Sequence, residues 1–221
     1  MTQHLTNKEE LIISGQVIYI ETISNIEDLF ENLLKKDPEH EDIKDERIPY
    51  WADLWPSAVA LSEYISEKKI VFQGLKVLEL GCGLGLPGIV AGRLGAKLVL
   101  TDYIQEALDL ARHNWSLNNI DSAEFIRMDW RKPDTNINAD IVIASDIAYE
   151  KKSFEDLVAA FKSLLAPGKK IIISEPDRAF AQSFFYELRN RGFNVKTETR
   201  SLIFRSHRYT IHVHELEFSG A

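Results

Sequence analysis

A glycine-rich turn between two apolar stretches constrains the fold of this chain more than any other feature. Residues 76–80 are rich in Val and Leu, which is typical of a strand buried on both faces, and residues 81–85 read Gly-Cys-Gly-Leu-Gly. Residues 89–94 continue as a predicted helix, and a second apolar run at 97–100 leads to Asp102. This order of strand, turn, helix, strand and acid predicts half of a nucleotide-binding βαβ unit.

The spacing of the glycines and of two acids indicates the kind of ligand. Because glycine has no Cβ, Gly81, Gly83 and Gly85 let a ligand approach the backbone closely. Glu79 lies two residues before the first glycine, where an acid suits a positively charged amino group better than a pyrophosphate. Asp102 is placed to accept hydrogen bonds from both hydroxyls of a ribose. A dinucleotide-binding site would have the spacing G-x-G-x-x-G, which this loop lacks. The second alternative is a tight turn that binds no ligand, and the presence of Glu79 and Asp102 beside the glycines disfavours it.

Length and composition limit the class of protein. A chain of 221 residues that is 45% hydrophobic can bury one substantial α/β core. Its net charge of -8 disfavours a broad phosphate-binding surface, so a nucleic-acid partner is not expected. Cys82 is the only cysteine, which fits a reducing compartment. Neither a membrane-spanning run nor a signal-peptide pattern is visible, so we predict a soluble, cytoplasmic protein without a membrane partner.

The amino-terminal residues predict an accessory region. Residues 11–13 and 16–22 read as a hairpin or strand pair. A Ser24-x-x-Glu capping box then precedes a run with helical spacing of apolar residues. Residues 35–47 are almost all charged and predict a solvated connection. We therefore expect an amino-terminal cap and charged linker over residues 1–48, without recognisable chemistry.

Two further predicted strands end in candidate site residues. Residues 124–128 lead to Asp129 and Trp130, and residues 140–144 lead to a Ser145-Asp146-Ile-Ala-Tyr149 sequence. Open α/β sheets bind ligands at the carboxyl ends of their strands. Asp129 can accept a hydrogen bond from an exocyclic amine, and Trp130 can stack on a flat ring. The alternatives are a turn acid, a core indole and a packed tyrosine.

Two tryptophans precede the next predicted helix. Trp51 and Trp55 lie in the Pro-Tyr-Trp-Ala-Asp-Leu-Trp-Pro stretch of residues 49–56, and Pro56 suits the first turn of a helix. The indoles are either packing anchors or the wall of a pocket beside the glycine turn.

The carboxyl-terminal part completes the predicted sheet. An apolar strand is expected at 170–174, a helix at 178–190, and an antiparallel pair at 194–200 and 209–217, with 201–208 between them. These patterns predict an α/β fold with a seven-stranded, mostly parallel sheet, an antiparallel last strand and helices on both faces. His212 and His214 share one face of that last strand, but no third ligand has suitable spacing, so no metal site is predicted.

These motifs resemble those of a known family. Glu79-Leu-Gly81-Cys-Gly83-Leu-Gly85 with Asp102 resembles the S-adenosylmethionine site of class I, seven-β-strand methyltransferases. Leu54-Trp55, Asp129-Trp130 and Asp146-Ile-Ala-Tyr149 are similar to family 16, the protein-lysine methyltransferases. The stretch at 49–56 is especially similar to the branch of the electron-transfer-flavoprotein β-subunit lysine methyltransferases. The resemblance implies a Rossmann-like methyltransferase domain over residues 49–221.

The resemblance also implies a cofactor and roles for individual residues. S-adenosylmethionine would be the cofactor, with its methionine moiety held by Glu79 and the glycine-loop amides and its ribose held by Asp102. Asp129 and Trp130 would frame the adenine, and Trp55 would contact the cofactor from the helix side. The other expected contacts with the cofactor are Gly81, Cys82, Gly83, Gly85, Tyr103 and Ser145.

A protein carrying a lysine is the acceptor that the resemblance implies. In that reaction Asp146 would orient the amine, and the ring of Tyr149 would form a wall; a strand-end cap and a core tyrosine are the structural alternatives. A small-molecule or RNA methyltransferase would have the same cofactor half. However, amino-base methylases of this fold resemble one another in an Asn/Asp-Pro-Pro-Tyr/Phe loop that Asp146-Ile-Ala-Tyr149 does not match. A second alternative is a regulatory module that binds the cofactor without catalysis, which would need an occluded acceptor channel. A third is a nicotinamide dehydrogenase, which the glycine spacing disfavours.

Overall fold

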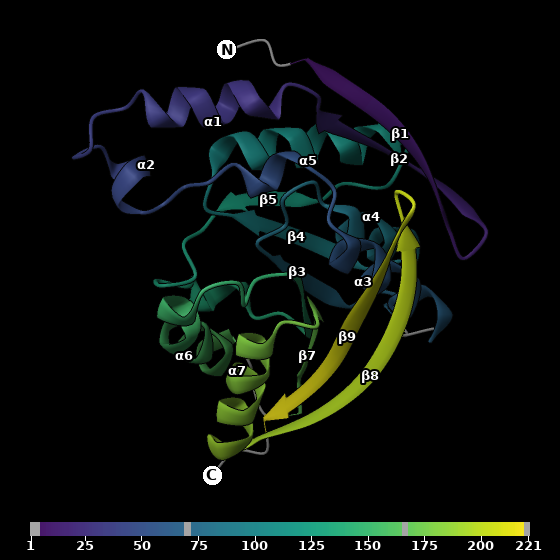
Figure 1. Ribbon diagram of the computed structural model, residues 1–221. Helices are drawn as coiled ribbons and strands as arrows, with labels where there is room; N and C mark the ends of the chain where they lie inside the picture. The colour runs from purple at the N-terminus through teal and green to yellow at the C-terminus, as the bar shows by residue number, and fades with distance from the viewer. Residues whose placement is uncertain (1–4, 69–71, 165–167, 219–221) are drawn as a thin grey trace.

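The apolar runs of the sequence form the parallel part of one sheet. The computed structural model describes residues 5–68, 72–164 and 168–218. Five strands of the sheet run parallel: β3 (Lys76–Leu80), β4 (Lys97–Asp102), β5 (Glu124–Arg127), β6 (Ile141–Ser145) and β7 (Lys170–Pro176). β9 (His207–Phe218) pairs antiparallel with both β7 and β8 (Phe193–Phe204), and the strand order is β5-β4-β3-β6-β7-β9-β8. The predicted seven-stranded sheet with an antiparallel last strand is confirmed (Figure 1).

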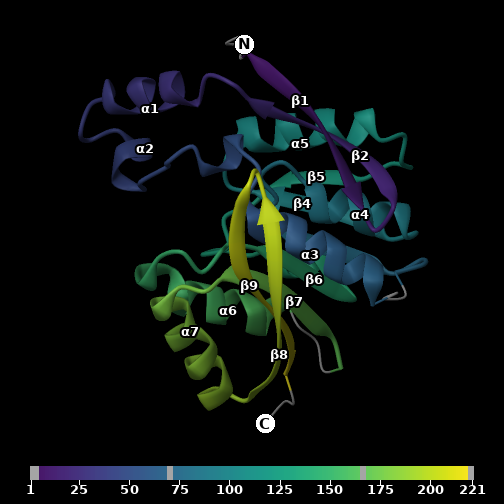
Figure 2. The same cartoon turned by 45° about the vertical axis from the view of Figure 1, so that its right-hand side comes forward.

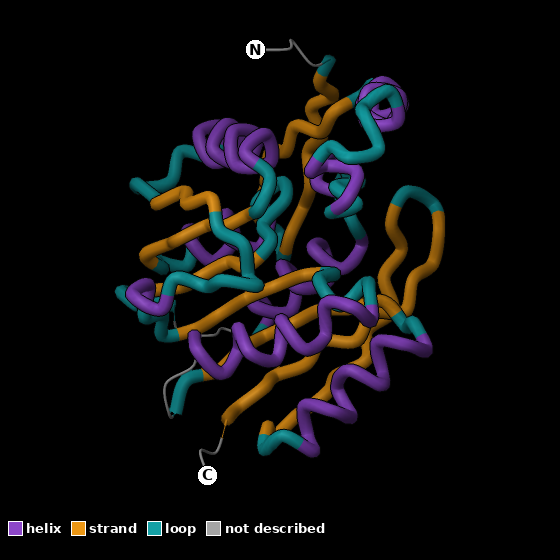
Figure 3. The backbone as a smooth tube through the Cα atoms, turned by 90° about the vertical axis from the view of Figure 1, so that its left-hand side faces the viewer, coloured by secondary structure: helices purple, strands orange, loops and turns teal. Residues whose placement is uncertain are grey.

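Helices cover both faces of this sheet (Figure 3). Because successive side chains of a strand point to opposite faces, Val77 and Leu78 of β3 are both fully buried but belong to different halves of the core. One half packs under α3 (Pro56–Glu67), α4 (Leu86–Arg93) and α5 (Gln105–Leu117); the other packs under α6 (Phe154–Leu164) and α7 (Ala179–Asn190). No helix among the described residues is long and apolar enough to cross a bilayer.

The predicted amino-terminal hairpin is confirmed and lies against α5 (Figure 2). It consists of β1 (Thr6–Ile13) and β2 (Gln16–Ile23). The buried side chains of Asn114 on α5 and Asn118 directly after it accept hydrogen bonds from the backbone N–H groups of Glu21 and Tyr19, at 2.7 and 3.0 Å. The hairpin is therefore fixed to the sheet domain by buried polar contacts, while the division of the chain at residue 48 stays a prediction.

The segment that follows the hairpin differs from the expectation. α1 (Ile26–Leu34) begins after Asn25, not after the predicted Ser24 cap. The reason is that the Ser24 N–H donates to the Leu5 carbonyl at 2.8 Å, so Ser24 still belongs to the hairpin. The predicted solvated connection contains the short helix α2 (Glu41–Lys44) and then turns back over the sheet.

The last two strands are longer than predicted, and they leave no extended connection. β8 and β9 are joined by a two-residue turn at Arg205 and Ser206, which have φ values of 46° and 66°. Such hairpin turns need positive φ at both positions and usually carry Asn or Gly. The turn was invisible in the sequence because neither residue is typical of it. Arg205 is held in place by Asp53 and Glu9, whose carboxylates accept hydrogen bonds from its guanidinium at 3.0 and 2.6 Å.

Three 3₁₀ turns complete the described secondary structure: η1 (Tyr50–Ala52), η2 (Thr135–Ile137) and η3 (Lys151–Ser153). The first of them precedes α3 and the last precedes α6. Both contribute residues to the cavity described next.

Candidate active site

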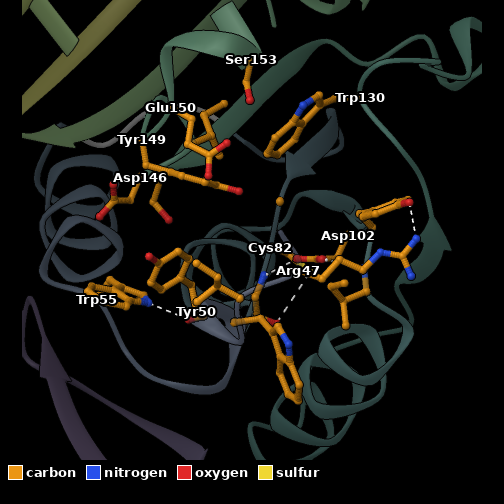
Figure 4. A pocket seen from close by; sticks show the side chains of 18 of the residues that line it. Arg47, Tyr50, Trp55, Cys82, Asp102, Trp130, Asp146, Tyr149, Glu150 and Ser153 are labelled. Carbon is orange, nitrogen blue, oxygen red and sulfur yellow. Dashed lines mark hydrogen bonds between the residues drawn. The ribbon is translucent and has the colours of Figure 1, made fainter. Parts of the chain in front are cut away.

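The carboxyl ends of the parallel strands meet at one cavity of about 590 Å³ (Figure 4). Parallel strands all end at the same edge of a sheet, so residues that follow different strands come together there. Gly81 after β3, Asp102 at the end of β4, Asp129 after β5 and Asp146 after β6 all line the cavity. The prediction that these four residues gather at one edge is confirmed.

Most of the predicted site residues line this cavity. Glu79 is the exception, because its side chain lies behind the glycine loop and is 1% exposed. The predicted residues that do line the cavity are Trp55, Gly81, Cys82, Gly83, Gly85, Asp102, Tyr103, Asp129, Trp130, Ser145, Asp146 and Tyr149.

The glycine loop has a backbone that other residues rarely adopt. Gly81, Gly83 and Gly85 have φ values of 64°, 48° and 78°, all in the left-handed region. A Cβ at Gly81 would also lie 3.3 Å from the Trp130 ring and from the Ile147 side chain. Glycine is therefore required both by the backbone conformation and by the close approach of neighbouring side chains.

Asp102 fixes this loop and still has free acceptor capacity. Its Oδ2 accepts a hydrogen bond from the Gly83 N–H and its Oδ1 from the Ile104 N–H, both at 3.0 Å. Desolvation raises the pKa of Asp102, while these backbone donors oppose the rise. A carboxylate has about four lone-pair sites, so Asp102 can still accept a hydrogen bond from a ligand in the cavity in addition to those from its backbone donors.

Glu79 supports the loop from behind. Its Oε2 accepts a hydrogen bond from the Gly88 N–H at 3.0 Å, and its buried Oε1 has no hydrogen-bond partner. A Cβ at Gly88 would lie only 2.4 Å from Oε2, so glycine is needed for this contact. The carboxyl thus holds the first turn of α4, and the predicted contact between Glu79 and a cofactor stays a prediction.

Glu79 should also make stability depend on pH. Burial, together with the negative charge of Asp102, raises its pKa to about 8, against the opposing effect of the hydrogen bond from Gly88. The folded protein therefore holds this proton more tightly than the unfolded chain, so the stabilisation is full below about pH 4.5 and is lost as pH rises through about 8. We expect the melting temperature to fall between about pH 5.5 and 8.5, and Glu79→Gln to reduce that slope.

Thermal scans of both proteins across this pH range measure the effect. Glu106→Gln, at an exposed position in the first turn of α5, is the matched control and should keep the wild-type slope. An unchanged slope in Glu79→Gln would show that this carboxyl does not titrate in the folded protein.

One of the two predicted adenine-side residues, Asp129, is paired with an arginine. Asp129 accepts hydrogen bonds from Arg131 Nε through both oxygens, at 2.9 and 2.8 Å. Trp130 lines the cavity from the opposite side to Trp55 and Tyr50 (Figure 4). Asp129 is therefore part of an ion pair at the rim, and its predicted bond to an exocyclic amine stays a prediction.

A second network of charged side chains, which sequence reasoning missed, comes from the predicted linker. Asp45 and Arg47 both line the cavity. The Tyr103 hydroxyl donates to Asp45 Oδ2 at 2.7 Å and accepts a hydrogen bond from Arg47, while Arg131 donates to Asp45 Oδ1 at 3.1 Å. The hydrogen bonds from Arg131 and Tyr103 lower the pKa of Asp45 to about 2. Alternating charges in a sequence look the same whether they face water or each other, so no local signal revealed this contact.

Three aromatic side chains form an open wall of the cavity. The Tyr50 ring centroid lies 5.8 Å from those of both Trp55 and Tyr149, edge to face in each case. The Trp55 indole N–H donates to the Tyr50 carbonyl at 2.7 Å, which fixes the orientation of the indole. Trp55 and Tyr149 are each 37% exposed. Of the two interpretations of Trp55, the geometry favours a pocket wall over a buried anchor.

Asp146 lies beside Tyr149 and is paired with a residue that sequence reasoning missed (Figure 4). Its two carboxylate oxygens accept hydrogen bonds from Nη1 and Nη2 of Arg178, at 2.5 and 3.2 Å. Asp146 has a φ of 53°, and its N–H donates to the Ser174 carbonyl at 2.8 Å. Arg178 was expected only as the start of a helix. Its place directly after the fifth parallel strand was the signal that could have put it at this edge.

The two histidines of β9 have hydroxyl partners. His214 Nδ1 lies 2.9 Å from the Thr197 hydroxyl, and His212 Nδ1 lies 3.0 Å from the Thr199 hydroxyl. Within the described part of the chain, no group of three or more His, Cys, Asp or Glu side chains is arranged to hold a metal ion.

Comparison with known proteins identifies the family to which this chain belongs. A sequence model described as lysine methyltransferase matches residues 40–191. The histone-arginine methyltransferase METTL23 of Mus musculus is 32% identical over 130 residues, which cover 56% of this chain and 51% of that protein. An electron transfer flavoprotein beta subunit lysine methyltransferase of Xenopus laevis is 32% identical over 134 residues, which cover 59% and 54%. The chain thus spans about half the length of these curated relatives.

The fold agrees with this match. Magnesium protoporphyrin IX methyltransferase from Synechocystis PCC 6803, solved with bound SAH, superposes with a TM-score of 0.58 at 16% identity, covering 88% of this chain and 94% of that one. This likeness confirms the predicted Rossmann-like, class I methyltransferase fold. Because the family match also covers more than half of the chain, this protein belongs to the lysine methyltransferase family.

Proposed function

We propose that this protein transfers the methyl group of S-adenosylmethionine to the side-chain amine of a lysine in a protein acceptor. One observation carries the proposal: a single cavity contains the glycine loop and Asp102 together with Asp146 and Tyr149. Its volume of about 590 Å³ lies in the range typical of small-molecule and cofactor sites. Donor and acceptor can therefore meet in one space.

The residues of the cavity fit the cofactor. The carboxylate of Asp102 offers about four lone-pair sites, so it keeps acceptor capacity for the ribose hydroxyls beyond the hydrogen bonds from its own backbone donors. The left-handed glycines leave the loop backbone open to the methionine moiety, and Trp130 offers a flat apolar surface for the adenine. When bound, the cofactor supplies a methyl group activated by a sulfonium.

The protein's own task is then to prepare the amine. A free lysine with a pKa of about 10.4 is neutral in only about one molecule in 2,500 at pH 7. Desolvation between Tyr50, Trp55 and Tyr149, beside a cationic cofactor, would lower that pKa. Asp146 would orient the amine toward the methyl group, and the aromatic rings would exclude water from the line of attack.

The other functions weighed for this chain have less support. A net charge of -8 disfavours an RNA acceptor, and Ile147 and Ala148 occupy the positions where amino-base methylases carry prolines. A non-catalytic module needs an occluded acceptor channel, whereas the wall made by Trp55 and Tyr149 is open to solvent. A small-molecule acceptor remains the rival that the experiment must separate.

We also propose a partner, a division into domains and a cellular location for this protein. The expected partner is a lysine-bearing protein, and residues 1–48 would act as a cap beside the methyltransferase domain of residues 49–221. A cytoplasmic location is in keeping with the single cysteine of the chain, Cys82.

The test is incubation of the purified protein with a cell lysate and radiolabelled S-adenosylmethionine. We expect label in protein and, after acid hydrolysis, in methylated lysine; Asp102→Ala is the inactive control. Label in methylated arginine would contradict the lysine acceptor. Arginine must be tested because a relative of this chain is named as an arginine methyltransferase. Label confined to RNA or to small molecules would contradict a protein acceptor.

A further inference from the structure

One guanidinium lies between two carboxyl groups at the end of β6. Arg178 donates to both oxygens of Asp146, and its Nη1 lies 3.8 Å from Oε2 of Glu175. Asp146 is 12% exposed and lines the cavity, whereas Glu175 is 1% exposed. Arg178 is thus hydrogen-bonded to the carboxylate of Asp146, which lines the cavity, and lies close to the buried carboxyl group of Glu175.

Only one of the two carboxyl oxygens of Glu175 has hydrogen-bond partners. Its Oε1 accepts hydrogen bonds from the N–H groups of Ile147 and Ala148, at 2.9 and 2.8 Å, and so holds the loop between Asp146 and Tyr149. Its Oε2 is buried and has no hydrogen-bond partner. A buried acceptor without a partner costs free energy unless a donor reaches it in another state of the protein. Arg178 is the charged donor near enough to do so.

Arg178 has room to move between the two. Its side chain is 31% exposed and also lines the cavity, and its guanidinium carbon lies 6.0 Å from the centre of the Phe180 ring. While it is bonded to Asp146, the negative charge of that carboxylate is neutralised inside the cavity. A cationic acceptor therefore meets a site whose anion is already paired.

We propose that Arg178 is an internal counter-ion that the lysine ammonium of the acceptor displaces from Asp146, and that Glu175 receives Arg178 when this happens. The inference rests on the proposed function, since it requires a cationic acceptor side chain. It makes Arg178 and Glu175 positioning residues that act through Asp146. The site would then expose its negative charge only when a cation is present to take it.

The exchange has a defined dependence on pH. Burial, and then the charge of Asp146, raise the pKa of Glu175 to about 8. The charged or titratable groups around Glu175 in the described structure are Asp146 after β6, Arg178 before α7 and, opposite it in the β7–β9 pairing, the imidazole of His212, whose Nε2 lies 3.2 Å from Asp177. Glu175 becomes a stronger partner for Arg178 as it ionises. Capture of a cation should therefore strengthen as pH rises from about 7 to 9, and Glu175→Gln should remove this trend.

The probe for the test is n-butylammonium, which has the length and charge of a lysine side chain. It is titrated by NMR into the protein saturated with S-adenosylhomocysteine, and n-butanol and sodium chloride serve as controls for the apolar stem and the ionic strength. We expect Arg178→Gln to bind the probe about tenfold more tightly than wild type, because the competing cation is gone. At about pH 9, where most of the wild-type Glu175 is ionised, Glu175→Gln should bind it about tenfold more weakly, because Arg178 then has no charged second partner.

The double variant separates exchange from structural support. Arg178→Gln with Glu175→Gln should bind the probe like Arg178→Gln alone, since Glu175 then has no cation to receive. Arg178→Lys should fall between wild type and Arg178→Gln. The matched control is Arg191→Gln, because Arg191 also bridges two carboxylates, Glu155 and Glu187, both at 2.5 Å, but lies outside the cavity. Calorimetry with S-adenosylhomocysteine confirms that each variant is folded.

Two results would overturn the exchange. One is Arg178→Gln binding n-butylammonium no better than wild type, including no binding by either protein. The other is that Glu175→Gln weakens binding of the probe by the same factor in the presence and in the absence of Arg178. Glu175 would then only support the loop between Asp146 and Tyr149. A failure of the proposed function would appear separately, as absence of labelled lysine in the lysate experiment with wild-type protein.

Discussion

Asp146→Asn is expected to lower the rate of methyl transfer by about 10²-fold while cofactor affinity stays close to that of wild type. Asparagine keeps the size of the side chain and part of its hydrogen bonding, but it loses the charge that would orient the amine. An interaction that aligns the lone pair with the methyl carbon is stronger in the transition state than in the ground state, so its loss appears in turnover. Tyr149→Phe should cost less, because the ring that forms the wall survives.

Single-turnover transfer to the acceptor found in the lysate, run beside calorimetry with the cofactor, measures this effect. Glu187→Gln is the matched control, since it removes a carboxylate that is also paired with an arginine, at 2.5 Å, but lies away from the cavity. Transfer by Asp146→Asn at the wild-type rate would exclude the amine-orienting role. The acceptor would then have to be positioned by Tyr50 and Trp55.

Asp102→Ala should weaken the binding of S-adenosylmethionine by about 10²-fold or more. Two hydrogen bonds to the ribose would be lost, and bonds to a charged acceptor contribute about 1.5–3 kcal/mol each. The variant also releases the Gly83 and Ile104 N–H groups that Asp102 holds at 3.0 Å, so the glycine loop would lose its support. Asp102→Asn should fall between, because its amide oxygen can still accept.

Calorimetry with S-adenosylmethionine and with S-adenosylhomocysteine gives both affinities. Asp109→Ala on α5, whose side chain is 60% exposed and does not line the cavity, is the control for removal of an acid outside the site and should bind normally. Wild-type affinity in Asp102→Ala would remove this residue from the cofactor site. Preferential binding of NAD by the wild-type protein would contradict the methyltransferase assignment as a whole.

Several parts of the fold could be predicted because they depend on local pattern. Short, mostly apolar runs of four or five residues identified the parallel strands, and Gly81, Gly83 and Gly85 marked a turn that needs left-handed backbone. Parallel strands end at one edge, so strand order along the chain was enough to bring Asp102, Asp129 and Asp146 to one cavity. No knowledge of side-chain contacts was needed for that step.

Strand ends and caps were less predictable, because neighbours compete for the same backbone groups. Ser24 had the pattern of a helix cap, yet its N–H is used by the hairpin through the Leu5 carbonyl. The β8–β9 turn at Arg205 and Ser206 carries neither the Asn nor the Gly that such hairpin turns favour, and it is held by ion pairs to Asp53 and Glu9. Both features depend on residues that are distant in sequence.

The sequence by itself determined the sheet, the glycine loop and the residues that follow the parallel strands into the cavity. The tertiary structure alone decided which charges meet there: Asp45 and Arg47 reach Tyr103 across more than fifty residues, and Arg178 pairs with Asp146. It also turned Glu79 away from the cavity. The physical reason is that strand and helix periods repeat over a few residues and leave a local mark, whereas an ion pair forms wherever the folded chain brings two opposite charges together, and either charge alone looks like any solvated residue.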